Sequence, residues 1–130
     1  MISVDTNVIV RLLVGDDRDQ AQRARALFAL NPIGIGKTVL LETECVLRSA
    51  YGFSAAEIRR GFEQLLGLPQ VTLADQAVIV PALAWYREGM DFADALHLSE
   101  AIDADSFATF DRALKACAER LKGTPPIIAP

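Results

Sequence analysis

The chain has 130 residues, of which 52% are hydrophobic, and it carries a formal net charge of −4. This length suits one domain with a real core, and the composition excludes a disordered tail. The negative charge argues against a general nucleic-acid coat, which would be basic overall, but it leaves room for a local basic face or an acidic metal pocket.

Membrane and targeting signals are absent from the sequence. No stretch approaches the roughly 18 apolar residues of a membrane span, and the first residues show neither a basic region nor a cleavage signature. The two cysteines, Cys45 and Cys117, lie far apart and are expected to be free thiols, without the Cys/His spacing typical of zinc sites. We therefore expect a cytoplasmic protein with a single domain, residues 1–130.

Short apolar runs alternate with longer segments of helical periodicity. Strands are expected at residues 2–5, 33–36, 71–73, 106–109 and 127–128. Helices are expected at residues 17–30, 38–51, 54–66 and 75–88, from residue 91 to beyond residue 102, and at residues 111–121. Ser54 and Glu57 form a capping box at the start of the third helix, and Pro81 is awkward inside the fourth because it deletes a backbone hydrogen bond.

Strands that are separated by helices predict an α/β fold whose parallel sheet is covered on both faces. The carboxyl ends of parallel strands share one edge of the sheet, which is where open α/β sheets bind their ligands. Asp5 and the segment Thr109–Asp111 each follow an expected strand. They can therefore share that edge.

Four acidic residues stand in comparable contexts, namely Asp5, Glu42, Asp94 and Asp111. A carboxylate at the end of a buried strand, such as Asp5, costs desolvation unless a cation or several donors satisfy it. Asp5 is also the hardest of the four to explain away, because more apolar chain follows it. Asp91 and Asp111, taken singly, have a plainer explanation as N-caps of helices.

Glu42 lies in an otherwise apolar helical run, with Val39 and Val46 on the same side of the helix. Glu44 falls about 200° away at 100° per residue, so the two glutamates cannot enter the same pocket. We prefer Glu42 as the ligand, because a surface role explains it less easily, and we interpret Glu44 as a solvated charge. His97, the only histidine, is set aside as a ligand because it has no histidine partner.

Carboxylates that lie within a few ångströms repel one another, so some stay protonated unless a cation joins them. Oxygen-only ligands select hard cations such as Mg²⁺ or Mn²⁺. Mg²⁺ keeps several waters and can hold a nucleophilic water and a substrate phosphate together, which is the chemistry of phosphodiester hydrolysis. Residues expected to support the carboxylates or a metal-bound water by hydrogen bonds are Thr6, Asn7 and Thr109. Basic residues that are candidates to follow the flanking phosphates are Arg11, Lys37, Arg48 and Arg87.

Four segments carry a family resemblance when they are taken together and in order. They are Val4-Asp5-Thr6-Asn7-Val8-Ile9-Val10, Leu41-Glu42 followed by Val46-Leu47-Arg48, Asp91-Phe92-Ala93-Asp94-Ala95-Leu96-His97, and Ala108-Thr109-Phe110-Asp111. With them the chain resembles a PIN-domain ribonuclease, specifically the VapC-type toxin of a toxin–antitoxin pair. The resemblance spans essentially the whole chain.

The resemblance implies a three-layer α/β/α domain with a parallel sheet of about five strands, and Mg²⁺- or Mn²⁺-dependent cleavage of RNA. It implies that Asp5, Glu42 and Asp94 form the core acidic set and that Asp111 is its fourth member. It also implies a homodimer, and inhibition by a small antitoxin protein whose tail inserts into the acidic groove.

Two other classes of function stay open. A phosphoryl-transfer domain, phosphatase-like or receiver-like, would use one strand-end aspartate as acceptor; a haloacid-dehalogenase-type phosphatase wants a second aspartate two residues later, where this chain has Asn7. A non-catalytic protein-binding module would use the acids only as caps and surface charges. The apolar helices at 38–51 and 54–66 fit a dimer interface or packing within the monomer.

Overall fold

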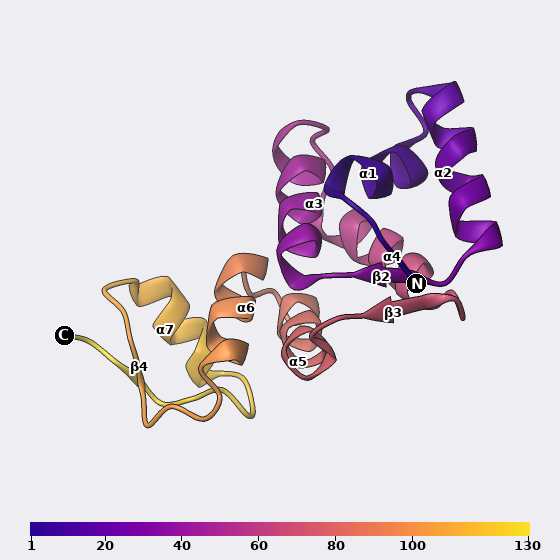
Figure 1. Cartoon of the computed structure of the whole chain (residues 1–130). Coiled ribbons are helices and arrows are strands. Elements are labelled where there is room, and N and C mark those ends of the chain that lie inside the picture. The colour runs from indigo at the N-terminus through magenta and orange to yellow at the C-terminus, as the bar shows by residue number, and fades with distance from the viewer. The chain divides into compact units, whose positions relative to one another are not determined.

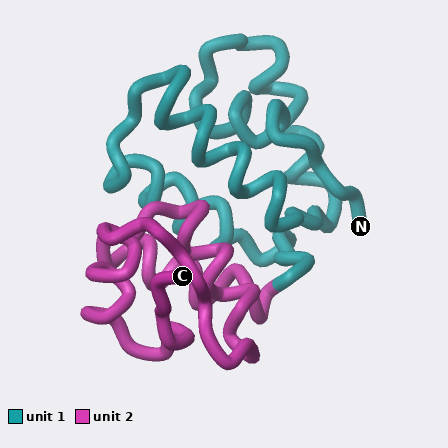
Figure 2. Tube along the Cα trace, turned by 90° about the vertical axis from the view of Figure 1, so that its left-hand side faces the viewer, with its two compact units in different colours: residues 1–75 teal, residues 76–130 magenta.

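The computed structural model describes residues 1–130 and divides them into two compact units, Met1–Asp75 and Gln76–Pro130 (Figure 2). All of the strand pairings are parallel. No helix is both long enough and apolar enough to cross a membrane. The α/β class predicted from the sequence is confirmed.

The first unit contains a three-stranded sheet in the order β1-β2-β3, and two helices connect each strand to the next (Figure 1). Ile2 pairs with Ile33, and Ile33 pairs with Val71. The carboxyl ends of the three strands therefore lie at one edge of the sheet. The elements of this unit are β1 (Ile2–Ser3), α1 (Thr6–Val14), α2 (Arg18–Leu30), β2 (Ile33–Ile35), α3 (Lys37–Ser49), α4 (Ala55–Leu66) and β3 (Val71–Leu73).

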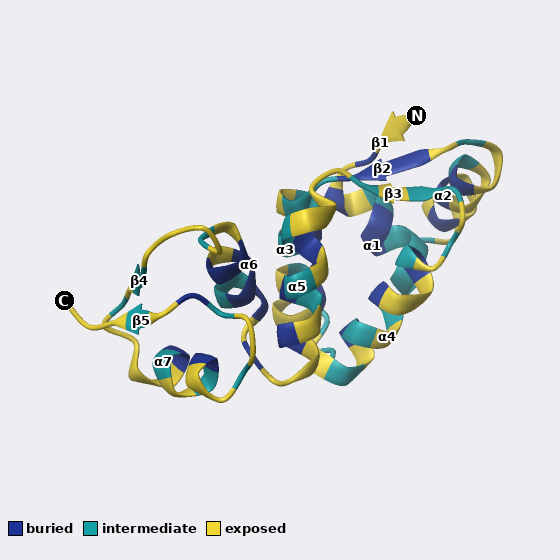
Figure 3. Ribbon diagram, turned by 90° about the horizontal axis from the view of Figure 1, so that it is seen from below, coloured by how far each residue is buried: buried dark blue, intermediate teal, exposed yellow.

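The core of the first unit forms around the central strand, β2, which is buried along its whole length (Figure 3). Ile33 and Ile35 are fully inaccessible to solvent. α4 contributes a buried stripe at helical spacing, Ile58, Phe62 and Leu65, as expected for an amphipathic helix against a sheet. Buried apolar area of this kind supplies the main driving force for folding.

The second unit is mostly helical and contains α5 (Gln76–Arg87), α6 (Phe92–Glu100), β4 (Phe107–Ala108), α7 (Arg112–Glu119) and β5 (Ile127–Ile128). α5 and α6 pack closely, with the Tyr86 and Phe92 rings 5.1 Å apart. The Ser99 hydroxyl donates to the Val78 carbonyl at 2.6 Å, and Trp85 Nε1 donates to the Lys122 carbonyl at 3.2 Å. This last bond fastens the chain beyond α7 to α5.

The strands differ from the expected pattern in one respect. All five expected strands form, but they hydrogen-bond as a sheet of three and a separate pair, β4 with β5, rather than as one sheet. β1, β4 and β5 contain two residues each. Such short strands offer few positions for ladder hydrogen bonds, and the sequence pattern does not determine which partners they choose.

Most helix limits agree with the sequence to within a few residues, including the Ser54–Glu57 capping box. Two elements differ. The segment Thr6–Val14, to which the sequence analysis assigned no structure, is helix α1. α6 was expected to continue past Ile102, but it ends at Glu100, and the residues that follow form turns.

The apolar residues of the helix pair α3 and α4 are used inside the first unit. Leu40, Leu47 and Phe62 are each almost completely buried. The large apolar side chains that remain exposed lie outside both helices, at Met1, Ile2, Leu30, Val80, Ile102, Phe110 and Ile128. The apolar content of these two helices therefore gives no separate support for a dimer interface.

Candidate functional site

Asp5 lies where β1 ends, at the carboxyl edge of the three-stranded sheet, and it begins helix α1. Its carboxylate Oδ1 accepts a hydrogen bond of 2.8 Å from the Thr6 N–H, and the Val8 N–H donates to its carbonyl at 3.1 Å. The sequence analysis found Asp5 the hardest of the four acids to explain away because it did not recognise helix α1, which Asp5 caps. The cap uses the Oδ1 atom of the carboxylate, and Asp5 remains exposed.

Glu42, on α3, lines the same pocket as Asp5. The pocket has a volume of about 290 Å³ and is lined by residues of α1 and α3 together with Asp5 and Tyr51. Val10 and Val46 form part of its apolar wall. Glu42 is exposed, not surrounded by an apolar face as its neighbours in sequence indicated. The pocket nevertheless brings a carboxylate from the sheet edge and one from α3 to a single cavity.

Glu44 is on the buried side of α3, so the interpretation of this residue as a solvated charge was wrong. Only 3% of the residue is accessible to solvent, and Arg48 Nε donates to its Oε1 at 3.0 Å. A buried carboxylate needs such a partner. The helix therefore turns its two glutamates to different surroundings, Glu42 to an open pocket and Glu44 to the protein interior.

Thr6 and Asn7 follow Asp5 along the first turn of α1, and both line the pocket. Thr6 is buried, and its hydroxyl oxygen has no hydrogen-bond partner. A buried hydroxyl without a partner is uncommon in proteins and calls for a water or an ion beside it. Asn7 is exposed. Thr6 and Asn7 therefore line the same pocket as Asp5 and Glu42, and their hydrogen bonds to the carboxylates or to a metal-bound water stay a prediction.

Arg11 is fixed at the mouth of this pocket by three neighbours. Its Nε donates to Gln20 Oε1 at 2.7 Å, and its Nη1 donates to Asp16 Oδ1 and to the Tyr51 hydroxyl, both at 3.1 Å. The Tyr51 hydroxyl in turn donates to Asp16 Oδ2 at 2.9 Å. These bonds raise the pKa of Arg11 and lower the pKa of Asp16, in both cases chiefly through the Tyr51 hydroxyl.

The second unit holds three further acids. Asp94, on the first turn of α6, is half-buried, and the Asp91 carboxylate caps that helix by accepting from the Asp94 N–H at 3.1 Å. Burial raises the pKa of Asp94 above its ordinary value, and the charges of Asp91 and Asp111 raise it further, while nearby His97 lowers it. Asp91 and Asp111 are thus close enough to Asp94 for their charges to affect its ionisation. His97 itself is exposed.

Asp111 is the N-cap of α7 and follows the end of β4 by three residues. Its Oδ1 accepts from the Ala113 and Leu114 N–H groups at 2.9 and 3.0 Å, so it is an N-cap, as its position in the sequence indicated. The Asp111 N–H donates to Thr109 Oγ1 at 3.0 Å. Thr109 therefore holds the backbone of Asp111 rather than its carboxylate. The intervening Phe110 is 83% exposed.

The remaining basic candidates have varied surroundings. Lys37 Nζ lies 4.0 Å from Asp75 Oδ2, a pair at the carboxyl edge of the sheet. Arg48 is held by the buried glutamate described above. Arg87, the last residue of α5, is exposed. Asp16 and Tyr51 orient Arg11, and the sequence analysis selected neither of them. Tyr51 follows Arg11 by 40 positions, so no local sequence pattern indicates that the two side chains meet.

The side chains that could hold a divalent cation are few. Neither unit contains three His, Cys, Asp or Glu side chains placed to hold a metal ion among themselves. Mg²⁺, however, commonly binds one or two carboxylates and keeps several waters. The pocket of Asp5 and Glu42 offers two carboxylates and the unpartnered Thr6 hydroxyl, all of them oxygen donors. These residues fit a hydrated hard cation.

A comparison with protein-family models matches residues 2–120 to the PIN domain. The chain belongs to the PIN domain family. The match spans nearly the whole chain and includes residues of both units. Searches among curated proteins and among solved structures gave no significant match.

PIN domains are generally metal-dependent nucleases, and they usually use Mg²⁺ or Mn²⁺. Family membership therefore places this PIN domain among the nuclease-type hydrolases. The family match supports the resemblance found in the sequence at the level of the domain.

Proposed function

We propose that this PIN domain is a divalent-metal-dependent endoribonuclease and the toxin of a toxin–antitoxin pair. The observation that carries the proposal is the pocket of Asp5 and Glu42, with the buried Thr6 hydroxyl beside them, in a chain of this family. An arrangement of oxygen donors alone favours Mg²⁺ or Mn²⁺ over zinc or copper. We propose residues 1–130 as one functional domain.

In this proposal, which takes the acidic set from the family resemblance, Asp5, Glu42, Asp94 and Asp111 are the acidic residues that hold the cation. Bound Mg²⁺ would supply Lewis acidity and a water with a lowered pKa for attack on a phosphodiester. Asn7 and Thr6 would orient the carboxylates or a water by hydrogen bonds. Burial and the charges of Asp91 and Asp111 raise the pKa of Asp94, and a cation bound beside Asp94 would oppose both effects by favouring its ionised carboxylate.

Cleavage is tested with purified protein, single-stranded RNA and Mg²⁺. Asp5→Asn, Glu42→Gln and Asp94→Asn should each lower the cleavage rate by about 100-fold or more, as expected when an electrostatic stabiliser of the reaction is lost. Asp103→Asn is the matched control, because Asp103 is an exposed acid in the turns after α6. Equal rates for all four variants and the wild type would refute the assignment of these residues.

Metal dependence is tested separately by calorimetry. Mg²⁺ or Mn²⁺ should bind the wild-type chain, and Asp5→Asn should weaken that binding. Bound metal should also raise the free energy of unfolding, by about 2.7 kcal/mol at a metal concentration of 100 times the Kd. A chain that binds neither ion, in a preparation that is demonstrably folded, would contradict the proposal.

The toxin role rests on the resemblance to the VapC-type toxins. It predicts that expression of the wild type arrests growth, that Asp5→Asn does not, and that a small protein encoded beside this chain relieves the arrest. Normal growth with active, well-expressed wild-type protein would count against it. The homodimer and the cytoplasmic location belong to the same proposal, and light scattering at micromolar concentration tests the former.

A further inference from the structure

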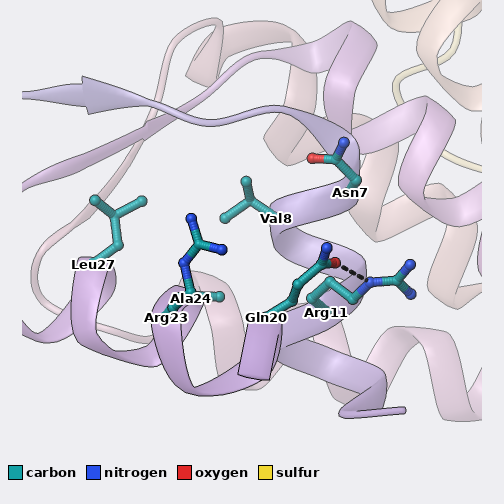
Figure 4. A pocket seen from close by; sticks show the side chains of 7 residues that line it. All are labelled: Asn7, Val8, Arg11, Gln20, Arg23, Ala24 and Leu27. Carbon is teal, nitrogen blue, oxygen red and sulfur yellow. Dashed lines mark hydrogen bonds between the residues drawn. The ribbon is translucent and has the colours of Figure 1, made fainter. Parts of the chain in front are cut away.

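A second cavity of the first unit lies between α1 and α2 and has a volume of about 410 Å³ (Figure 4). α1 contributes Asn7, Val8 and Arg11 to its lining. α2 contributes residues from Gln20 to Leu27, among them Arg23. A cavity of this size is in the range that accommodates a nucleotide-sized ligand.

The cavity is connected with the candidate metal pocket through shared residues. Asn7 and Arg11 line both cavities. A chain-like ligand whose reacting group lies beside Asp5 can therefore continue past Asn7 into the space between the helices. This continuity distinguishes the cavity from an isolated surface hollow.

The chemistry of the lining is mixed, as nucleotide recognition requires. Val8 and Leu27 provide apolar surface, Asn7 and Gln20 provide amide groups, and no carboxylate lines the cavity. The Oε1 of Gln20 is occupied by Arg11 at 2.7 Å, an arrangement that is drawn in Figure 4. This bond orients the amide, and the Gln20 NH2 group is a hydrogen-bond donor for a ligand.

Arg23 is the cation that can meet a phosphate here, whereas Arg11 already holds Asp16. Arg23 Nη1 lies 3.7 Å from Asp19 Oδ2, with about three quarters of both side chains exposed. Exposed pairs of this kind are weak, so a phosphate group can replace Asp19. In Figure 4 the Arg23 guanidinium rises from α2 toward Val8.

We propose that the cavity between α1 and α2 binds a nucleotide of single-stranded RNA adjacent to the cleaved phosphodiester. The base lies on Val8 and Leu27, the Asn7 and Gln20 amides contact its polar edge, and Arg23 neutralises the flanking phosphate. The inference rests on the proposed function, because it names the substrate chemistry of the neighbouring pocket.

The test measures binding rather than cleavage. Fluorescein-labelled single-stranded RNA of mixed sequence is titrated with the full Asp5→Asn chain, and the Kd is determined by anisotropy at several salt concentrations. Arg23→Ala in this background should raise the Kd about fivefold and lower the salt slope by about 1, as for loss of one phosphate contact. Arg25→Ala is the control, because it removes the same charge from the same helix but lies beside Gly15, outside the cavity lining.

A second pair of variants tests the apolar wall. Leu27→Glu places a negative charge in the cavity and should raise the Kd about tenfold by repelling phosphate. Leu30→Glu makes the same change on the same helix at a residue that is 80% exposed and outside the lining, so the Kd should change less than about twofold. Circular dichroism of each variant verifies that the helices persist.

The outcomes separate this inference from the proposed function. Variants that bind RNA as tightly as their controls, in a wild type that cleaves RNA, overturn the cavity assignment and leave the nuclease standing. Weakened binding by both cavity variants, in a wild type that does not cleave RNA, supports the cavity and overturns the nuclease. A parent chain that does not bind RNA at any salt concentration overturns the cavity assignment, and it overturns the nuclease as well only where the wild type does not cleave RNA.

Discussion

The Tyr51 hydroxyl donates a hydrogen bond to Asp16 at 2.9 Å although the two residues are 35 positions apart. The same hydroxyl accepts from Arg11 at 3.1 Å. These contacts fasten the turn after α1 to the segment after α3, and both helices contribute residues to the pocket of Asp5 and Glu42. This hydrogen-bond network therefore holds together the segments that line the candidate site.

Tyr51→Phe should remove these hydrogen bonds of the hydroxyl without changing the shape of the side chain. At neutral pH the variant should unfold at a slightly lower urea concentration than the wild type. Because the Tyr51 hydroxyl lowers the pKa of Asp16, the stability linked to Asp16 is present above its ordinary pKa of 3.8 and is lost as the pH falls through the lowered value. The difference between the two proteins should therefore shrink below about pH 3.8.

Urea unfolding at several pH values checks this prediction, and Asp16→Asn serves as the control. In the Asn background, Tyr51→Phe should produce little pH-dependent difference in the acid range, since the titrating group is gone. A difference between wild type and Tyr51→Phe that grows toward acid pH would contradict the assigned coupling.

Glu42→Gln and Glu44→Gln form a matched pair two residues apart on α3. Glu44→Gln disturbs a buried carboxylate bonded to Arg48 and should lower the free energy of unfolding by about 1–3 kcal/mol. Glu42→Gln changes an exposed side chain and should alter it by less than about 0.5 kcal/mol while weakening metal binding. Chemical denaturation measures the change in stability, and calorimetry measures the change in metal binding. If Glu44→Gln weakened metal binding and Glu42→Gln lowered stability, Glu44 would be the ligand and Glu42 the structural residue.

Thr6→Val replaces the buried hydroxyl by a methyl group of nearly the same size. Without metal the variant should be as stable as the wild type, or more stable by about 1 kcal/mol, because the Thr6 hydroxyl has no hydrogen-bond partner. With Mg²⁺ present the wild type should gain more stability than the variant does. Thermal unfolding with and without the ion tests this; equal gains would exclude Thr6 from the site.

Asp111→Ala should cost stability that Asp111→Asn does not. The Asp111 carboxylate caps α7 by accepting from two backbone N–H groups, and loss of such a cap costs about 1 kcal/mol, whereas asparagine caps equally well. Both variants should lose metal-dependent activity if Asp111 holds the ion. Unfolding free energies report the contribution of Asp111 to helix capping, and cleavage rates report its contribution to metal binding. An alanine variant as stable as the asparagine variant would show that the cap does not stabilise the protein.

Structural features that depend on residues close together in the sequence could be predicted. The capping box of Ser54 and Glu57, and the helix starts at Asp17, Asp91 and Asp111, depend on side chains that bond to backbone groups within three residues. β3 was found for a similar reason, since its apolar run is bounded by turn residues. Local chemistry fixes these elements before tertiary packing takes part.

Features that depend on distant partners could not be predicted. The burial of Glu44 is a property of the assembled unit, not of the apolar residues next to it in sequence. Nor does the sequence indicate that Arg11 meets Tyr51, or which strands pair with β4. Asp5 shows a further limit. Because helix α1 was not predicted, the hydrogen bond by which the Asp5 carboxylate caps that helix was not predicted either.

The caps at Asp5, Asp91 and Asp111 contrast with Glu42, which starts no helix and faces solvent. If the proposed function is right, substitution of Glu42 should therefore abolish activity while the chain still folds and accumulates in the cell. On that proposal, cells that survive forced expression through a substitution at Glu42 should contain normal amounts of the protein. Survivors with alanine at one of the capping aspartates should contain less of it, because loss of a helix cap lowers stability and exposes the chain to proteolysis.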